Sequence, residues 1–163
     1  MIERSLVLLK SDAVERSITG ELVSRFEKAG FKILGTKMFW ADDDFARKHY
    51  SEDIEKRHGK EIRDRIVSYL KEGPVLALVL EGVNAIENIR KIVGDTYPHE
   101  ALPGTIRGDY AHISKDYANN KKINVKNLVH ASANKEDAEV EINLWFSDSE
   151  LYKYETLFEK HVH

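Results

Sequence analysis

The sequence predicts an α+β protein built on a βαββαβ core, with a four-stranded antiparallel sheet, helices packed on one face of it, and some extra helices. Three observations predict this class: four apolar runs have the length of strands, helical periodicity fills most of the intervals between them, and the two kinds of segment alternate in this order. At 163 residues the chain is long enough to bury one core, so we expect a single domain over residues 1–163.

The first half of the chain predicts two strands and three helices. The strands are apolar or alternating runs, and the helices have apolar residues at helical spacing between capping or glycine signals. In chain order these elements are a strand over 5–9, a helix that follows Lys10 and ends at Gly30, a strand over 31–40, a helix from the acidic cap 42–44 to Tyr50, and a charge-rich helix over 52–71.

The second half predicts two strands and two helices around an irregular segment. Periodicity fails from Asp95 to about Lys126, and so long an aperiodic stretch in a compact protein is usually functional or mobile. The predicted elements are a strand over 75–82, a helix capped by Asn84 and ended by Gly94, a strand over 125–131, and a last helix that Asn134 caps with Asp137 as partner.

Composition excludes several classes of function. Lys and Arg number 25 against 28 Asp and Glu, a net charge of -3 that gives no general attraction to nucleic acid or to anionic membranes. Lys121 and Lys122 form only a small basic spot. The chain has no cysteine, no signal-peptide pattern after Met1 and no apolar run long enough to span a bilayer. We therefore expect a cytoplasmic protein without membrane or nucleic-acid partners.

His130 is the leading catalytic candidate, at the end of the strand over 125–131. On a helical wheel of the last helix, Glu141 falls beside Trp145 at the edge of the apolar arc, so its carboxylate faces the protein and needs a partner. We expect His130 to be that partner, with the carboxylate orienting the ring and supporting a basic nitrogen. The alternatives are a purely structural histidine and an ion pair from Glu141 to a lysine.

The stretch GTIRGD, residues 104–109, is a candidate anion site. Its glycines allow a close backbone approach and Arg107 offers a bidentate fork, although an ordinary turn with a surface arginine is the alternative. Taken alone, Lys10 is predicted to be a solvated side chain at the sheet edge. Arg90 and Thr96 by themselves indicate no function. Without a cysteine nucleophile or a cluster of metal-binding carboxylates, the chain fits phosphoryl transfer in which Mg²⁺ arrives bound to a nucleotide.

Residues 127–146, NLVHASANKEDAEVEINLWF, resemble the active-site signature of nucleoside diphosphate kinases. Four more blocks are similar to that family in the same order, so the resemblance covers nearly the whole chain: KSDAVERSITGELVSRFEKAGFKILGTKM from Lys10, HY at 49–50, GPVLALVLEGVNAIENIRKIVGDTYP from Gly73, and PGTIRGDY at 103–110. The fold that it implies is the ferredoxin-like form of the βαββαβ sandwich.

The resemblance implies a ping-pong reaction that maintains nucleoside triphosphate pools. The γ-phosphate of a nucleoside triphosphate such as ATP would pass to Nδ1 of His130 and then to a nucleoside diphosphate, with Mg²⁺ carried by the nucleotide, in a homo-oligomer that is a hexamer or a tetramer. The implied site residues are Glu141 holding the histidine, Ser132 bonding to that glutamate, Tyr50 shaping the pocket, Lys10, Arg107 and Asn127 on the phosphates and sugar, and Arg90 and Thr96 near the β-phosphate.

The chain departs from the family pattern in several places. Ser11 stands where the family has proline, and Ala131 where it has glycine. Residues 51–66 lack the aromatic that stacks on the base in the family, which leaves Ile66 or His58 as the candidate platform. The chain is also longer than common members between Asp109 and Asn127.

These departures keep a second class of function open. A non-catalytic module for nucleotide sensing or protein interaction could retain the fold while residues 51–66 and 110–126 bind a partner. Turnover of ATP with a diphosphate such as GDP separates the two hypotheses.

Overall fold

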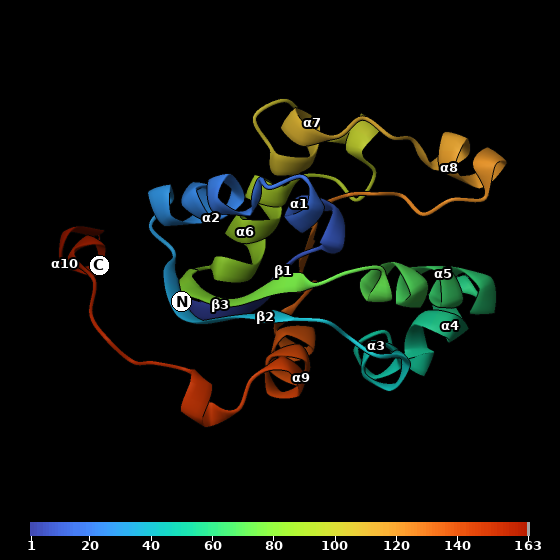
Figure 1. Ribbon diagram of the computed structural model, residues 1–163. Helices are drawn as coiled ribbons and strands as arrows, with labels where there is room; N and C mark the ends of the chain where they lie inside the picture. Colours follow the sequence, from blue (N-terminus) through green and yellow to red (C-terminus); the bar gives the residue numbers. More distant parts are fainter. Residues whose placement is uncertain (163) are drawn as a thin grey trace.

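The computed structural model describes residues 1–162 of the chain. A four-stranded sheet in the order β2-β3-β1-β4 forms its core, and every neighbouring pair of strands is antiparallel (Figure 1). The order, with the first and third strands at the centre, is that of the ferredoxin-like fold, so the predicted fold class is confirmed. The strands are β1 (Ile2–Leu9), β2 (Lys32–Phe39), β3 (Val75–Val83) and β4 (Val129–Ala131).

Helices of very different length connect and cover these strands. The helices are α1 (Ser11–Glu15), α2 (Thr19–Lys28), α3 (Asp43–His49), α4 (Glu52–His58), α5 (Lys60–Lys71), α6 (Ala85–Val93), α7 (Ile106–Tyr110), α8 (Lys115–Lys121), α9 (Lys135–Trp145) and α10 (Leu157–Val162), with 3-10 turns η1 (Pro98–Glu100) and η2 (Asp148–Glu150).

The prediction that helices pack on one face of the sheet is wrong, because both faces are covered. In Figure 1, α2 and α6 lie above the sheet while α9 lies below it. Side chains alternate along β1: Val7 and Leu9 join the core with residues of α2 and α6, whereas Leu6 and Leu8 join the core with residues of α9. A central strand buried on both faces explains the unbroken apolar run at 5–9.

Two predicted helices are each divided in two by a residue with positive φ. The helix expected after Lys10 breaks at Ser17, where φ is 56°, and becomes α1 and α2. The helix expected over 52–71 breaks at Gly59, where φ is 90° and ψ is 157°, and becomes α4 and α5. Helical backbone has negative φ, so a helix cannot continue through either position although the apolar spacing does.

The other predicted boundaries are partly right. Asn134 caps α9 as expected, since its Oδ1 accepts a hydrogen bond from the backbone N–H of Asp137 at 2.8 Å. Asn84 precedes α6 in a left-handed conformation and makes no side-chain cap. β4 covers only the end of the predicted strand over 125–131, and the aperiodic segment after Asp95 contains η1, α7 and α8.

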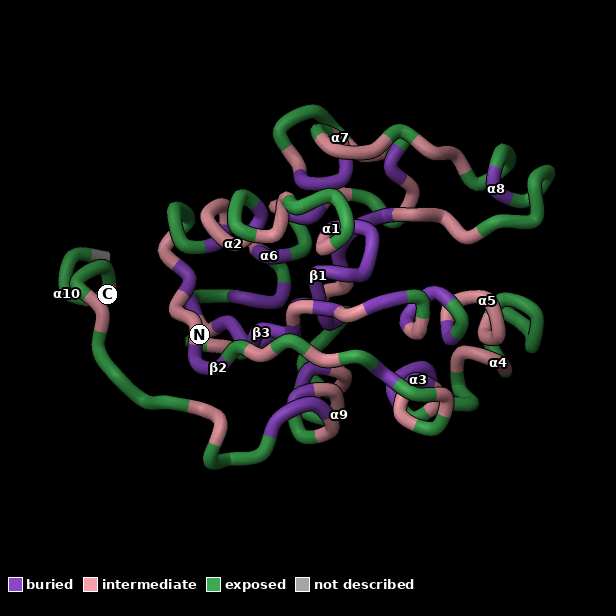
Figure 2. The backbone as a smooth tube through the Cα atoms, in the orientation of Figure 1, coloured by how far each residue is buried: buried purple, intermediate pink, exposed green. Residues whose placement is uncertain are grey.

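Burial separates a closed core from three exposed parts of the chain. Figure 2 shows buried residues along most of β1 and β3, and exposed residues over much of α4, α8 and the segment after α9. That last segment returns along β2, where the Tyr152 N–H bonds to the Leu34 carbonyl at 2.8 Å and Lys32 pairs with Glu159 at 2.6 Å. Among the described residues, no helix is both long and apolar enough to cross a membrane.

We predict that Gly59→Ala destabilises the protein by roughly 1–3 kcal/mol, because the conformation of Gly59 is one that only glycine adopts without strain. A Cβ at Gly59 would meet no heavy atom within 4 Å, so the backbone alone sets this cost. Gly20→Ala in α2 is the matched control: its Cβ also meets nothing within 4 Å, and helix propensity favours alanine by up to ~1 kcal/mol. Urea denaturation measures both, and equal stability of the Gly59→Ala protein and the wild type would contradict the prediction.

Candidate active site

His130 projects from β4, the edge strand that pairs with β1. In the register His130 lies opposite Leu8 and Val129 lies opposite Leu9. Val129 packs into the core with α2 and α6, so the alternation of the strand turns His130 toward the opposite face, where α9 lies. The sequence continues from β4 into α9 through a short turn, which brings the ring and the helix together.

Glu141 of α9 receives this imidazole, as the helical wheel predicted. The His130 Nε2 atom lies 2.8 Å from Glu141 Oε1, and the Ser132 hydroxyl donates to Glu141 Oε2 at 2.6 Å. Ser132 is itself fixed, because the Leu6 N–H donates to its Oγ at 3.0 Å. Burial raises the pKa of Glu141, but the bonds and charges from His130 and Ser132 outweigh this and lower it to about 2.

The charged carboxylate determines which ring nitrogen is available. An ionised carboxylate only accepts hydrogen bonds, so Nε2 of neutral His130 carries the proton and Nδ1 carries the lone pair. The His130 side chain keeps 20 % of its surface exposed, against 14 % for Glu141. A nitrogen with a free lone pair, on a partly accessible ring, is therefore held opposite a partly buried acid, the arrangement of an oriented nucleophile.

Lys10 is buried beside the site, contrary to its reading as a solvated side chain. It is 8 % exposed, its ammonium donates to Asn127 Oδ1 at 2.7 Å, and it lies over the Tyr69 ring at 4.5 Å. Burial, together with the nearby Arg107 charge, lowers the pKa of Lys10 to about 7. One hydrogen bond leaves two of the three ammonium protons for a further acceptor.

The sequence suggested that Arg107 offers an open fork to an anion, but its guanidinium binds carbonyl groups of the protein. Its guanidinium donates to the carbonyls of Asn127, Gly94, Asp95 and Val129 at distances from 2.5 to 3.1 Å. Four of its five N–H groups are thereby used, and one remains. Burial lowers the pKa of Arg107 to about 10, so the group is still a cation at neutral pH.

The glycines around Arg107 also have a structural explanation. A Cβ at Gly108 would lie 2.1 Å from the Leu102 carbonyl oxygen, so backbone packs against backbone there and no anion is needed to explain the residue. Gly104 has a φ of 90°, which the turn into α7 requires. The geometry therefore explains both glycines without an anion.

Asn127 connects the other predicted binding residues. Its amide nitrogen donates to the Thr96 carbonyl at 2.9 Å while its oxygen accepts from Lys10. Thr96 and Arg90 are both exposed, and Arg90 lines a hollow beyond α6 together with Gly94. Arg90 lies near enough to Arg107 to contribute to its lowered pKa, so this side of the site holds three cations close together.

Asp12 and Tyr69, which were not among the expected site residues, hold the strained backbone before His130. Leu128 has a φ of 67°, rare for a residue with a branched side chain, and its N–H donates to Asp12 Oδ2 at 3.1 Å. The Tyr69 hydroxyl accepts from the Asn127 N–H at 3.2 Å and donates to Asp12 Oδ1 at 2.7 Å. Asp12 lies in the KSD stretch that carries the resemblance, whereas nothing in the sequence distinguishes Tyr69 from other helix residues.

Two aromatic side chains, His49 and Tyr50, pack next to His130. The ring of His49 lies against His130, with centroids 4.8 Å apart, and Tyr50 packs on His49 at 4.6 Å. Tyr50 is 8 % exposed, and burial with the charge of Glu141 raises the pKa of its hydroxyl. Tyr50 is thus near the site, while His49 is the residue in contact with the candidate nucleophile.

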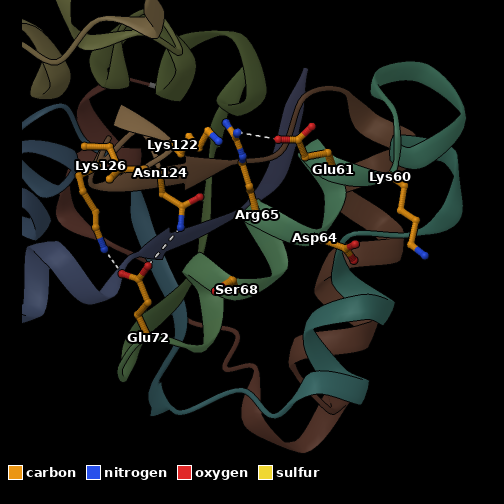
Figure 3. Close-up of a pocket in the computed structure, with 10 residues that line it drawn as sticks. Lys60, Glu61, Asp64, Arg65, Ser68, Glu72, Lys122, Asn124 and Lys126 are labelled. Atoms are coloured by element: carbon orange, nitrogen blue, oxygen red, sulfur yellow. Dashed lines mark hydrogen bonds and ion pairs between the residues drawn. The ribbon is translucent and has the colours of Figure 1, made fainter. Parts of the chain in front are cut away.

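The long segment before Asn127 is tied to α5 along a surface groove. In Figure 3, Glu72 bonds to both Lys126 and Asn124, and the groove that these residues line has a volume of ≈ 940 Å³. Arg65 reaches α8 through Asn119 at 3.3 Å. Neither Ile66 nor His58 lines this groove, so the groove identifies no base platform. These contacts hold in place the segment that leads into Asn127.

The geometry as a whole suits one kind of chemistry. An imidazole with its lone pair directed away from a buried acid, next to buried cations, can attack phosphorus and carry a phosphoryl group while the cations offset the negative charge. A phosphotransferase is the class of protein that this fold and site fit.

Comparisons with known proteins identify the family. The model of the family "Nucleoside diphosphate kinase" matches residues 3–151. The nucleoside diphosphate kinase of Borreliella burgdorferi is 41 % identical over 155 residues, 94 % of this chain and 93 % of that protein, and that of Pyrococcus horikoshii is 47 % identical over 152 residues, 93 % of this chain and 90 % of that protein.

Solved structures agree with this assignment. A transition state mimic of the nucleoside-diphosphate kinase from Borrelia burgdorferi, with bound vanadate and ADP, has a TM-score of 0.95 at 40 % identity and covers 98 % of this chain and 96 % of that one. An NDP kinase from Pyrobaculum aerophilum has a TM-score of 0.86 at 37 % identity, covering 94 % and 100 %. The chain belongs to the nucleoside diphosphate kinase family.

We predict that nucleotide binding takes up close to one proton at pH 8. The pKa of free Lys10 is about 7, and a bound polyphosphate favours the charged ammonium and raises that pKa, so between the two values binding is accompanied by protonation. Affinity for a Mg²⁺-bound nucleoside diphosphate should accordingly fall as the pH rises above 7. Calorimetry in two buffers of different ionisation enthalpy measures the uptake. Lys10→Met should abolish it, and uptake that persists in Lys10→Met would contradict the assignment to Lys10.

Proposed function

We propose that this protein transfers the γ-phosphate of a nucleoside triphosphate to a nucleoside diphosphate through a phosphohistidine at His130. The observation that carries the proposal is the 2.8 Å bond between His130 Nε2 and Glu141, which leaves Nδ1 as the nucleophile. The family relationship supports the reaction, and the geometry supports the residues that perform it.

The first half-reaction phosphorylates the enzyme. The Nδ1 lone pair forms a bond to the γ-phosphorus, the bond from that phosphorus to the bridging oxygen breaks, and its electron pair stays on the nucleoside diphosphate that leaves. The ring gains positive charge because Nε2 keeps its proton, and the ionised Glu141 stabilises that charge. In the second half-reaction an oxygen of the incoming diphosphate attacks the same phosphorus, and His130 leaves with its lone pair restored.

We assign the phosphate contacts to the cations around Asn127. Lys10 has two free ammonium protons and Arg107 one free N–H, so each can bind a phosphate oxygen without giving up its protein bonds. Asn127 holds Lys10 in place and contacts the sugar. Arg90 and Thr96, exposed at the edge of the site, contact the β-phosphate region. Ser132 acts through Glu141, and Tyr50 acts by enclosing the pocket.

We propose that Mg²⁺ enters as part of the nucleotide. In the described part of the chain, the three side chains that could together hold a metal ion are His49, His130 and Glu141. Imidazoles suit transition metals, whereas Mg²⁺ prefers oxygen ligands and keeps several waters. Phosphate oxygens supply the ligands that this protein set does not.

We also propose that the chain forms a homo-oligomer, a tetramer or a hexamer. Met38 on β2 and Trp40 just after it are 60 % and 65 % exposed, and large apolar side chains grouped at a surface favour association. Sedimentation equilibrium tests this, and a monomer at micromolar concentration would contradict it.

The direct test of the function uses ATP labelled at the γ-phosphate. The wild type should acquire an acid-labile, base-stable label that GDP removes as GTP, whereas His130→Ala should acquire none, because removing the nucleophile abolishes the intermediate. His112→Ala is the control, since His112 is an exposed histidine outside the site. Nucleotide binding without label or turnover in the wild type would favour a non-catalytic nucleotide-sensing module.

A second substitution tests the acid. Glu141→Gln keeps the size and an acceptor for Nε2 but removes the charge, so we predict a fall in kcat of about 100-fold or more, since the positive charge on the phosphorylated ring then lacks its counterion. Glu139→Gln is the matched control on the exposed side of α9. A Glu141→Gln enzyme with wild-type kcat would exclude an electrostatic role for this carboxylate.

A further inference from the structure

His49, the last residue of α3, has no role in the function proposed above, although its ring touches the nucleophile. The imidazoles of His49 and His130 meet edge to face, with centroids 4.8 Å apart and planes at 81°. His49 is 8 % exposed. A buried polar ring beside a reacting atom needs an explanation, because burial of an imidazole costs free energy unless its nitrogens are bonded.

The bond from Trp145 fixes the proton on His49. The indole Nε1–H donates to His49 Nδ1 at 3.1 Å. An indole nitrogen can only donate, so Nδ1 of His49 must be the acceptor and the neutral ring carries its proton on Nε2. That Nε2 atom is buried and has no hydrogen-bond partner among the described residues.

The same bond decides whether this site could hold a metal ion. One nitrogen of His49, one nitrogen of His130 and a carboxylate oxygen of Glu141 lie within 4.8 Å of one another, which is a possible group of metal ligands. A metal at Nε2 of His49 would need the lone pair there, and the proton would then have to move to Nδ1, where it would face the Trp145 N–H. Trp145 therefore makes Nε2 a donor and disfavours a metal.

The charges that face His49 keep it neutral. Burial, the His130 ring and the Lys10 ammonium all lower the pKa of His49, and the opposing effect of Glu141 is smaller, so the pKa is about 3. Tyr50 packs on the same ring and is uncharged at neutral pH. A cationic His49 would compete with His130 for Glu141, whereas a neutral one leaves that carboxylate to the nucleophile.

We propose that His49 is a positioning residue for phosphoryl transfer: a neutral imidazole, locked by Trp145, whose edge-to-face contact fixes the plane of the His130 ring. The inference rests on the proposed function. Glu141 restrains one nitrogen of His130 but allows rotation about that hydrogen bond, and the contact with His49 supplies the second restraint. Because His49 stays uncharged, it does not repel the positive charge that His130 gains on phosphorylation.

Nitrogen-15 NMR of the imidazoles in the wild-type protein tests the locked tautomer without any activity. We expect the His49 signals to show the Nε2–H tautomer from pH 5 to pH 9 with no titration. A titration midpoint within this range, or the Nδ1–H tautomer, would overturn the proposal. This outcome is independent of whether the protein phosphorylates itself.

Single-turnover phosphorylation of His130 tests the positioning. His49→Phe keeps an aromatic edge but accepts no bond from Trp145, so we expect the phosphorylation rate to fall at least about tenfold while the dissociation constant of the nucleotide changes less than about twofold. His49→Gln keeps a neutral acceptor for Trp145 but has no ring edge to place against His130, so it should also be slow. A wild-type rate in His49→Gln, or a loss of nucleotide affinity that matches the loss of rate, would overturn the proposal.

The double variant His49→Phe with Trp145→Phe separates positioning from folding. In the single variant His49→Phe the indole N–H is buried without an acceptor, which by itself could disturb the core, and Trp145→Phe removes that donor. We expect the double variant to regain thermal stability but to phosphorylate His130 as slowly as His49→Phe. Recovery of the wild-type rate in the double variant would overturn the proposal, because only the unpaired indole N–H would then explain the slow rate of His49→Phe.

A wild-type protein that takes no phosphate from ATP would instead refute the proposed function and leave the tautomer result standing.

Discussion

The hydrogen bond between Glu141 and His130 is the interaction on which the rest of the site depends. It places the imidazole proton on Nε2 and leaves the lone pair on Nδ1, and Ser132 keeps the carboxylate in position. The bond forms because β4 lies at the edge of the sheet, next to β1, and the following helix folds back over the face to which His130 points. A buried acid costs free energy, which the two hydrogen bonds and the charge of the ring offset.

The cations of the site are held by the backbone that leads to His130. Arg107 joins the carbonyls at 127 and 129 to those at 94 and 95, and Asp12 and Tyr69 bind the N–H groups of residues 127 and 128. Leu128 is forced into left-handed backbone in the middle of this network. Strain of this kind persists only where surrounding bonds fix the structure, and it is concentrated at functional sites. The positive charges and the nucleophile are therefore positioned by one connected set of bonds.

Much of the fold follows from the sequence, and the exceptions have physical causes. Apolar runs predicted all four strands, and the helical wheel predicted the partner of His130, because both depend on local periodicity. The breaks at Ser17 and Gly59 depend on a single φ value that apolar spacing does not record. The second covered face, the burial of Lys10 and the acceptors of Arg107 depend on contacts between segments far apart in the chain. His49 was visible only as part of a family motif, and its contact with His130 required the fold.

The central claim is that Glu141 leaves only one nitrogen of His130 free to carry phosphate. The most direct measurement is the position of the phosphoryl group in the phosphorylated protein, by phosphorus-31 NMR with nitrogen-15 histidine or by chromatography of an alkaline hydrolysate. The account predicts phosphate on Nδ1 of His130 with Nε2 still protonated. Phosphate on Nε2 would contradict it, because that nitrogen is the one bonded to Glu141.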